Sequence, residues 1–403
     1  MRGGVSMWTH AELSALTALH GEHFYLAYPE RFAANLARFH AAFAARWPRT
    51  TISYSVKTNY LPTFLRMVCT AGHAAEVVSR FEYELALHLG FPPERVVLNG
   101  PVKSPELLAH ACTVGALVHL DAAYEIDALE RLAGSHDPRE WRIGLRCNLA
   151  LAEAPSRFGF DVSSGELEAA ARRLHAIGVR VRGLHAHIAT QPKTLAAFVA
   201  RVRGLLDAAD RVFSNQPPDY LDAGGGFNPP GAPAGGPTFD DYAKAAADEL
   251  TRRYGTDGPE LILEPGVAVV RDAMSYVCRV LDVKTIAGKR IAITAGSIHT
   301  IRPTGYERHS QIAVVSNGSR PGAERVTLGG YTCMEHDLLT EDFPASVAPG
   351  DFLMVSNVGA YTTVFKPPFI DLAPPILVQK NGVWEPARRA ETVADLLGLY
   401  PGG

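Results

Sequence analysis

Between Thr51 and Gly266 the chain repeats one pattern: a short run rich in Val, Ile and Leu, then a turn, then a longer stretch with apolar residues at helical spacing. The eight apolar runs span residues 51–57, 75–79, 96–100, 116–121, 141–148, 181–188, 220–226 and 260–266. Nearly continuous apolar strands that alternate with helices predict a parallel sheet with both faces buried. Eight such units predict a closed α/β barrel of the (β/α)8 TIM type, and a doubly wound open sheet is the alternative.

After Gly266 the pattern changes to β-rich runs without long helical stretches. These runs span residues 275–283, 290–294, 311–316, 325–328, 351–356 and 375–379. The last run leads into Asn381-Gly382, a pair that accepts the positive φ angles of a type I′ turn and therefore predicts a β-hairpin. The sequence thus predicts a C-terminal all-β domain in addition to the barrel.

Composition narrows the classes of partner. Of 403 residues 47% are hydrophobic and 20% are charged, which is enough apolar material for two domains with cores of their own. The formal net charge is -3 and no run of like charge occurs, so neither nucleic acid nor a membrane surface is expected as a partner. No uninterrupted apolar segment approaches the roughly 18 residues of a membrane span, which makes a cytoplasmic protein the expectation.

The cysteines give no sign of a disulfide framework or a metal site. They are odd in number and never stand in a CxxC spacing, so we expect no metal, and most of them are expected to be small core residues. They are Cys69, Cys112, Cys147, Cys278 and Cys333.

Unusual residues gather where the predicted barrel strands end, which is where chemistry is placed in such barrels. Lys57 ends the first strand, and the sixth strand carries His185 and His187. The seventh strand ends in three glycines, residues 224–226, and the eighth ends in Glu264 followed by Pro-Gly. Each feature alone has an ordinary structural explanation: a surface lysine, a tight turn or an ion-pair partner.

Together these features meet the three needs of pyridoxal phosphate. A glycine turn between a strand and a helix leaves N–H groups free to bind a phosphate beside the helix N-terminus. A carboxylate such as Glu264 can keep a pyridine nitrogen protonated. A lysine in a crowded or desolvated site, here Lys57, forms imines with carbonyl groups.

Eight short motifs in order give the chain a resemblance to a known family. They are YSVKTN (54–59), SRFG (156–159), HAHIATQ (185–191), LDAGGGF (221–227), EPG (264–266), IRP (301–303), CMEHD (333–337) and GAYTTVF (359–365). The chain resembles the fold-type III, alanine-racemase-like decarboxylases, typified by diaminopimelate and ornithine decarboxylases. The resemblance implies a pyridoxal-phosphate-binding barrel over residues 29–274. Residues 1–28, with an N-terminal strand, would join residues 275–403 in the β-rich domain.

The resemblance also implies a role for particular residues. Lys57 would hold pyridoxal 5'-phosphate as a Schiff base, His187 would stack on the ring, and Glu264 would pair with its nitrogen. Further cofactor contacts would come from Thr190, Gly224, Gly225, Gly226, Gly266 and Tyr361. The amino-acid substrate would meet Arg302, Tyr306 and Asp337. Cys333 and Asp337 would come from the other subunit of a head-to-tail homodimer, with Cys333 as the proton donor.

Departures from the family pattern bear on the substrate. Val267 replaces the arginine that usually follows EPG, and Ala189 and Thr190 replace Gly and Ser. Met334 stands where diaminopimelate decarboxylases have a glutamate that binds the distal ammonium group of the substrate. Glu335 is one residue away and would point to the opposite side of an extended segment.

We therefore expect a decarboxylase that acts on a substituted or diamino acid, such as a citryl-diaminopropionate intermediate of siderophore or natural-product biosynthesis. One alternative is a diaminopimelate decarboxylase of lysine biosynthesis with rearranged side-chain contacts. A second is an amino-acid racemase on the same cofactor, for which a catalytic tyrosine facing Lys57 would be expected. A third is a non-catalytic paralogue that binds the cofactor.

Overall fold

The chain divides into two compact units. The computed structural model describes residues 8–151, 156–188, 193–214, 216–230, 236–303, 311–318, 324–365 and 368–402. One unit is Ala33–Val269, and the other combines Met1–Phe32 with Val270–Gly403. The sequence placed the corresponding boundaries at residues 29 and 274.

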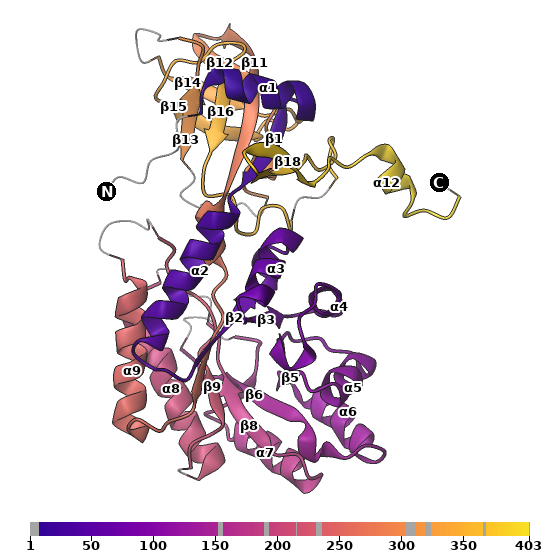
Figure 1. The fold of residues 1–403 in the computed structure, drawn as a ribbon, viewed down its shortest axis with the longest axis vertical. Coiled ribbons are helices and arrows are strands. Elements are labelled where there is room, and N and C mark those ends of the chain that lie inside the picture. The colour runs from indigo at the N-terminus through magenta and orange to yellow at the C-terminus, as the bar shows by residue number, and fades with distance from the viewer. Residues whose placement is uncertain are drawn as a thin grey trace. The chain divides into compact units, whose positions relative to one another are not determined.

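The first unit is a closed parallel barrel (Figure 1). Its strands are β2 (Thr50–Ser55), β3 (Ala74–Val77), β4 (Val96–Leu98), β5 (Leu117–Leu120), β6 (Arg142–Asn148), β8 (Val181–His185), β9 (Tyr220–Asp222) and β10 (Glu260–Leu263). They pair in the order β5-β4-β3-β2-β10-β9-β8-β6, and the pairing of β5 with β6 closes the ring. The two-residue strand β7 (Phe160–Asp161) adds to the edge of β6. The predicted barrel and all eight predicted strands are confirmed, and the open-sheet alternative is excluded.

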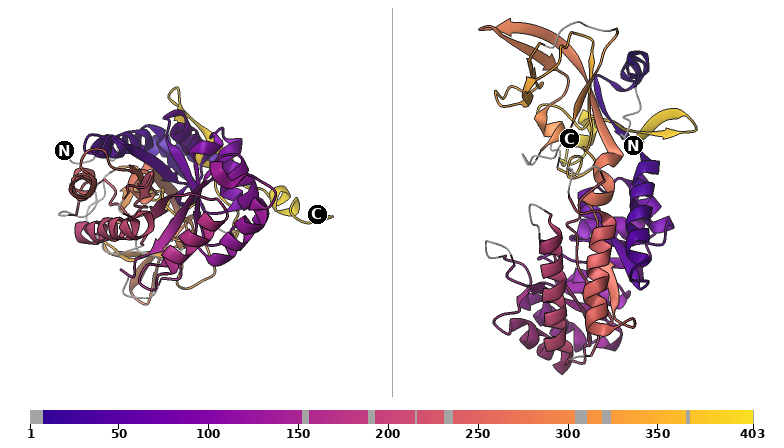
Figure 2. Two further views of the ribbon diagram at one scale, coloured as in Figure 1. Left: turned by 90° about the horizontal axis from the view of Figure 1, so that it is seen from below. Right: turned by 90° about the vertical axis from the view of Figure 1, so that its left-hand side faces the viewer.

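Helices connect the strands and lie outside them (Figure 2). They are α2 (Pro29–Ala44), α3 (Pro62–Thr70), α4 (Arg80–His88), α5 (Pro105–Thr113), α6 (Ala123–Ala133), α7 (Glu166–Ala176), α8 (Leu195–Phe213), α9 (Phe239–Tyr254) and the short α10 (Val267–Val270). Their starts follow from sequence: Ser79 accepts a hydrogen bond from the N–H of Glu82 at α4, and Ser104 caps α5 just before a proline at its first position. β3 and β4 therefore each lead into a helix with a side-chain cap.

The second unit is built on a mixed sheet. Its elements are α1 (His10–His20), β1 (His23–Ala27), β11 (Met274–Ile286), β12 (Lys289–Thr294), α11 (Ile298–Ile301), β13 (Ile312–Val315), β14 (Val326–Gly329), β15 (Leu338–Phe343), β16 (Phe352–Val355), β17 (Ile376–Lys380), β18 (Val383–Arg388) and α12 (Val393–Leu397). The main order is β15-β14-β12-β11-β1-β17-β18, while β16 pairs with β11 and β13 pairs with β16. All six strands predicted here are present, and β1 is the N-terminal strand that the resemblance implied.

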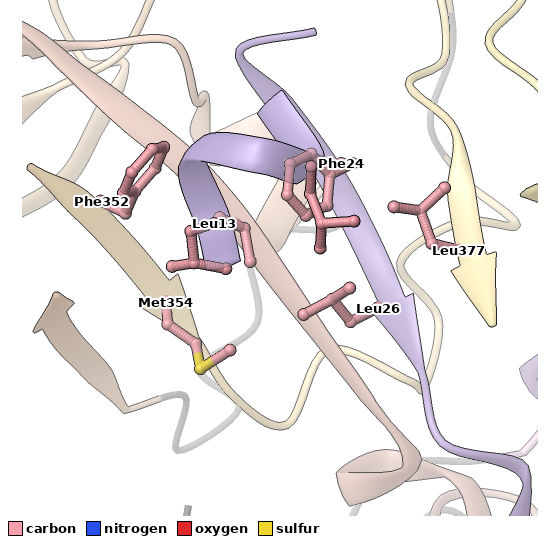
Figure 3. Packing of buried hydrophobic residues seen from close by; sticks show 8 residues of the cluster. Leu13, Phe24, Leu26, Phe352, Met354 and Leu377 are labelled. Atoms are coloured by element: carbon pink, nitrogen blue, oxygen red, sulfur yellow. The ribbon is translucent and has the colours of Figure 1, made fainter. Parts of the chain in front are cut away.

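Four elements of this unit were not predicted: α1, β15 and the short helices α11 and α12. β15 carries Glu341 and Asp342 in its exposed half, so its residues lack the alternation of a half-buried strand. α1 contributes Leu13 and Leu16 to a core that includes Phe24 of β1. Figure 3 shows Leu13 near Phe24 in this core. The remaining members of this core are Leu26, Val277, Phe352, Met354 and Leu377.

The hairpin between β17 and β18 matches its prediction. Asn381 and Gly382 have φ angles of 51° and 82°, the left-handed values that a type I′ turn requires at both central positions. The two strands pair antiparallel on either side of that turn. Among the described helices, none has both the length and the apolar character that crossing a membrane requires.

Candidate active site

Lys57 stands just past the carboxyl end of β2, in a short 3-10 helix that spans Val56–Thr58. Its Nζ donates to Oε2 of Glu76 over 2.5 Å, and the hydroxyl of Ser55 donates to the same oxygen over 2.7 Å. Glu76 lies in β3 and is buried, whereas 32% of the Lys57 side chain is exposed. The amine is thus held by a carboxylate, while the side chain as a whole stays partly exposed.

Glu264 directly follows the end of β10 and is buried. Its Oε1 accepts a hydrogen bond from Nδ2 of Asn99 over 2.5 Å, and its Oε2 lies 3.5 Å from Nε2 of His185. Asn99 follows the end of β4, and its Nδ2 also donates to Oε1 of Glu76 over 3.1 Å. One amide therefore contacts the carboxylate beside Lys57 and the carboxylate of Glu264.

Two histidine rings stack inside the barrel near these groups. The centroids of His119 and His185 are 4.8 Å apart with an interplanar angle of 11°. Burial holds the pKa of both imidazoles well below 6.5. Charge repulsion from His185 lowers the pKa of His119 further. Both are therefore neutral near pH 7, so the positive charges around Glu264 must come from elsewhere.

The glycine turn after β9 packs tightly against His187. The N–H of Gly225 donates to Nδ1 of His187 over 3.1 Å, which places the proton of this ring on Nε2. Desolvation, followed by the positive charge of Arg201, holds the pKa of His187 well below 6.5. A Cβ atom at Gly224 would lie 2.7 Å from the carbonyl oxygen of Ala186, and Gly224 has a φ of +65°. Only glycine fits here without moving the backbone.

The turn differs from the predicted phosphate cradle in two ways. The N–H of Gly224 donates to Oδ1 of Asp222 and that of Gly225 to His187, so two of its N–H groups are already engaged within the chain. The next helix, α9, begins only at Phe239, so the turn does not lead directly into a helix N-terminus as expected. Gly266, after β10, packs directly against the side chain of Thr58. A Cβ atom at Gly266 would collide with the hydroxyl oxygen of Thr58.

Asp222 is a second buried carboxyl beside Glu264. Burial and the negative charge of Glu264 raise the pKa of Asp222 well above 3.8. Its Oδ2 has no donor among the described residues, and two carboxylates this close are stable only when a proton lies between them. Asp222 therefore keeps its proton to a higher pH than an ordinary aspartate does.

Arg201, on α8, was not expected from the sequence. Its guanidinium is buried, and its Nη2 donates to the carbonyl oxygen of Gly225 over 2.8 Å. Burial lowers the pKa of Arg201 to about 10, so the side chain stays charged near neutral pH. A fixed cation beside the glycine turn favours an anion there, which supports a phosphate site by charge rather than by a helix terminus.

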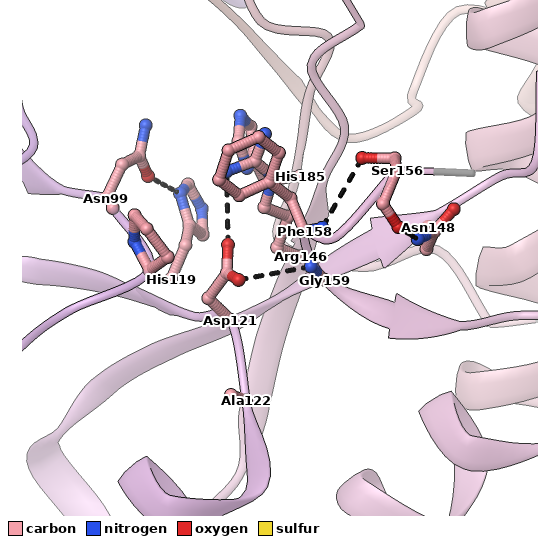
Figure 4. Close-up of polar contacts among 12 residues, drawn as sticks. Asn99, His119, Asp121, Ala122, Arg146, Asn148, Ser156, Phe158, Gly159 and His185 are labelled. Carbon is pink, nitrogen blue, oxygen red and sulfur yellow. Dashed lines mark hydrogen bonds and ion pairs between the residues drawn. The ribbon is translucent and has the colours of Figure 1, made fainter. Parts of the chain in front are cut away.

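A further ion pair anchors the SRFG segment, residues 156–159 (Figure 4). Nη1 of Arg146 donates to Oδ2 of Asp121 over 3.1 Å, and Oδ1 of Asp121 accepts the N–H of Gly159. The Arg146 guanidinium also lies 4.6 Å from the centroid of the Phe158 ring. The segment is thus tied to the ends of β5 and β6.

Of the two residues in the CMEHD motif that were assigned to the site, only Cys333 is exposed. Asp337 was predicted to meet the substrate, and that role stays a prediction. Asp337 is buried, and its oxygens accept hydrogen bonds from the hydroxyl of Ser297 and from the N–H groups of Ile298 and Thr332. With these three donors, Asp337 fastens its own loop to the start of α11.

Of four other predicted site residues, two lie in loops and two lie outside the residues that the structure describes. Arg302 ends α11, where its N–H donates to the carbonyl oxygen of Ile298. Tyr361 has a φ of 52°, a left-handed conformation that costs energy for a residue with a side chain and that is frequent at functional sites. Thr190 and Tyr306 lie outside the described residues.

The described part of the barrel also holds one group of possible metal ligands. One atom each of His119, Asp222 and Glu264 lies within 4.8 Å of the others. However, Nδ1 of His119 is 2.7 Å from Oδ1 of Asn99 and its Nε2 is 2.9 Å from the Tyr220 hydroxyl. A neutral imidazole has one lone pair, and here that lone pair accepts the hydroxyl proton. The group is therefore a hydrogen-bonded network in which the histidine has no lone pair left for a cation.

The barrel residues fit pyridoxal phosphate. They offer an accessible amine at Lys57, a neutral ring at His187, a buried anion at Glu264 and a glycine turn beside the cation of Arg201. These are the groups needed to attach the cofactor covalently, cover its ring, pair with its nitrogen and bind its phosphate. Glu76, Asn99, His119, Asp222 and Arg201 complete this arrangement, and sequence analysis had singled out none of them.

Comparison with known proteins agrees with this chemistry. The family "Pyridoxal-dependent decarboxylase, pyridoxal binding domain" matches residues 33–271, more than half of the chain. A diaminopimelate decarboxylase of Actinosynnema pretiosum subsp. auranticum is 31% identical over 88% of this chain and 84% of its own length. One from Methanothermobacter thermautotrophicus is 27% identical over 96% of this chain and 93% of its own.

Solved structures show the same fold. A diaminopimelate decarboxylase from M. jannaschii in complex with L-lysine has a TM-score of 0.87 at 23% identity, over 96% of this chain and 94% of that one. A lysine/ornithine decarboxylase from Vibrio vulnificus in complex with cadaverine has a TM-score of 0.79 at 18% identity, over 92% and 98%. The chain therefore belongs to the pyridoxal-dependent decarboxylases of the diaminopimelate and ornithine decarboxylase family, and it is a pyridoxal-phosphate-dependent carboxy-lyase.

Proposed function

We propose that this enzyme removes a carboxyl group from a diamino acid, with diaminopimelate as its leading substrate. The observation that supports the proposal most is one hydrogen-bonded group of residues in the barrel. Lys57 donates to Glu76, and Asn99 donates to both Glu76 and Glu264. The amine of Lys57 and the buried acid Glu264 therefore belong to one site. Both relatives compared above by sequence identity alone carry the name diaminopimelate decarboxylase. This substrate takes the place of the siderophore-type intermediate that the sequence departures had favoured.

The chain's own residues divide the work. Lys57 would hold pyridoxal phosphate through Nζ, Glu264 would lie against the ring nitrogen, and His187 would cover the ring. When bound, the cofactor supplies an electron sink for the electron pair that remains when a carboxylate leaves as CO2. Glu264 would keep negative charge next to that nitrogen, which favours its protonated form. The turn at residues 224–226, with Tyr361, would bind the phosphate.

Substrate binding and proton return are assigned to the second unit. Arg302 would bind a substrate carboxylate, since a guanidinium makes two parallel hydrogen bonds to such a group. Cys333 is exposed and would hold a proton at Sγ for return to the substrate carbon. We propose that Cys333 acts in the partner's site of a head-to-tail homodimer, and that the enzyme works in the cytoplasm.

A second candidate is decarboxylation of a substituted amino acid that lacks a distal ammonium group. The observation that favours it is Met334, a thioether where a glutamate would be expected to bind that group. Glu335 is exposed, but it stands one position further along the chain. The substrate side chain therefore decides between the two candidates.

The test follows CO2 release by the purified, pyridoxal-phosphate-loaded enzyme. The substrates are meso-diaminopimelate, ornithine, lysine and a set of N-substituted and citryl-substituted diamino acids. The leading proposal predicts CO2 from meso-diaminopimelate and formation of lysine. Release only from substituted compounds would favour the second candidate, and Met334→Glu should then raise turnover of meso-diaminopimelate. Exchange of the α-hydrogen without CO2 from any compound would instead indicate a racemase and contradict both.

A further inference from the structure

Asn99 lies at the centre of the barrel's polar network and is buried. Its Nδ2 is 3.1 Å from Oε1 of Glu76 and 2.5 Å from Oε1 of Glu264. An amide nitrogen carries two hydrogens, so it can donate to both carboxylates at once. If the amide were turned around, its Oδ1 would face two carboxylate oxygens, and none of these atoms could donate a hydrogen bond. The Nδ2 end of Asn99 must therefore face the carboxylates.

This orientation determines the protons of the next two residues. Oδ1 of Asn99 faces Nδ1 of His119 at 2.7 Å, so Nδ1 must carry the hydrogen. Nε2 of His119 is then the acceptor, and the Tyr220 hydroxyl, 2.9 Å away, must donate to it. The bonds thus run in one direction, from Tyr220 through His119 and Asn99 to the two carboxylates.

The two ends of this chain of bonds meet the groups that handle the cofactor. Glu76 accepts from Lys57, the attachment point in the proposed function, and from Ser55. Glu264 lies beside Asp222, and its Oε2 is 3.5 Å from Nε2 of His185. The charged or titratable side chains whose fields act on this network are Lys57, Glu76, Lys103, His119, Arg146, His185, Arg201, Asp222 and Glu264.

We propose that Asn99 is a positioning residue that couples the carboxylate partner of Lys57 to Glu264, with His119 and Tyr220 fixing its orientation. This inference rests on the proposed function. By donating to both carboxylates, the amide spreads part of their negative charge and limits their attraction for protons. Without these donors, Glu76 stabilises a positive charge on the nitrogen of Lys57 more strongly. That nitrogen should then lose its proton at a higher pH.

The test titrates the near-visible absorbance of the bound cofactor against pH in the full-length, cofactor-loaded enzyme. Asn99→Asp keeps the shape of the side chain and replaces its donors with an acceptor, and Asn99→Ala deletes both. Each should raise the midpoint of the titration by roughly one pH unit. Unchanged midpoints in both variants at full cofactor occupancy would overturn the proposal, because a purely structural residue would change stability and leave the midpoint in place.

Tyr83→Phe is the control for loss of a buried hydrogen bond. The Tyr83 hydroxyl lies 2.9 Å from Nδ1 of His110, between α4 and α5, which lie outside the barrel strands. This variant should lower thermal stability and leave the midpoint of the parent. A midpoint shifted as far as in the Asn99 variants would show that the titration reports general loosening, and it would also overturn the proposal.

A second measurement uses only the parent protein without cofactor, so it does not depend on whether a variant folds. In 15N-histidine-labelled parent protein without cofactor, NMR should show His119 neutral at pH 6 with its proton on Nδ1. A proton on Nε2 would contradict the direction of the hydrogen bonds and with it the role of Asn99. A parent protein that binds no pyridoxal phosphate would instead contradict the proposed function, and the NMR result would stand separately.

Discussion

Nζ of Lys57 lies 2.5 Å from Oε2 of Glu76, a carboxylate supplied by the neighbouring strand of the barrel. Ser55 Oγ and Asn99 Nδ2 also donate to this carboxylate. Three donors keep Glu76 in one place although it is buried. Lys57 therefore has a fixed carboxylate partner within the barrel.

Loss of the charge at Glu76 should impair the enzyme. Glu76→Gln keeps the size of the side chain and removes the anion that contacts Lys57. Hydrogen bonds to charged groups contribute about 1.5–3 kcal/mol, so kcat/KM for CO2 release should fall roughly 10- to 100-fold. The control is Glu82→Gln, because Glu82 is buried in α4 and caps the N–H of Val78 without such a bond to Lys57. Equal losses in both variants would contradict a specific role for Glu76.

The part of the site that the sequence predicted lies at strand ends. Lys57, Glu264 and the glycines at residues 224–226 interrupt apolar runs, and a parallel barrel brings the ends of its strands to one edge. Glu76 lies inside such a run, and Asn99 lies near the end of another. A single polar residue at such a position does not indicate which side chain it will bind. Pairs of this kind depend on which strands are neighbours and on their register.

Two further residues show what a sequence motif leaves open. Arg201 stands on α8 among apolar residues, and only the packing of that helix against the glycine turn gives it a role. Within the CMEHD motif, Cys333 and Asp337 were assigned to the active site. In the structure the carboxylate of Asp337 accepts hydrogen bonds from three donors of its own unit. A sequence motif alone does not tell an acid with such structural hydrogen bonds from one that binds substrate.

The protonation of Asp222 predicts a difference between two substitutions. Asp222→Asn retains a neutral side chain with an oxygen that can accept the N–H of Gly224. It should keep cofactor affinity within about threefold and most of the activity. Asp222→Ala removes that acceptor and leaves a gap beside Glu264, so the dissociation constant for pyridoxal phosphate should rise about tenfold or more. Equilibrium dialysis compares the two, and equal losses would show that Asp222 acts as an anion.

Buried histidines should make stability depend on pH. Burial holds the folded-state pKa of His119 and His185 well below 6.5, so below pH 6.5 the unfolded chain binds more protons and stability falls as pH falls. Each histidine contributes up to about 1.4 kcal/mol per pH unit in that range. The raised pKa of Asp222 acts in the opposite sense, because the folded chain then holds an extra proton above pH 3.8.

Urea unfolding between pH 5 and 7 can separate these effects. His119, His185 and His187 outnumber Asp222, so the free energy of unfolding of the parent should fall as pH is lowered, with the aspartate offsetting only part of that fall. In Asp222→Asn only the histidine contribution remains, so the free energy of unfolding should drop more steeply as pH is lowered. The same slope in both proteins would contradict the protonated state assigned to Asp222.

Shared active sites in a homodimer can be tested by mixing inactive variants. Lys57→Ala removes the attachment point, and Cys333→Ala removes the proposed proton donor. If each site takes these residues from different subunits, a mixed dimer contains one intact site, and an equal mixture should recover about one quarter of the parent activity. No recovery after subunit exchange, confirmed by mass spectrometry, would show that both residues act from the same subunit or that no such dimer forms.

The most direct test is the near-visible absorbance of the purified enzyme with pyridoxal phosphate, recorded after gel filtration and without added amine. We predict that the parent and Lys244→Ala, which changes an exposed lysine of α9, retain the absorbance band of a cofactor bound to lysine. Lys57→Ala should lose this band completely. A band that persists in Lys57→Ala would contradict the account, because the cofactor would then be attached to a different amine.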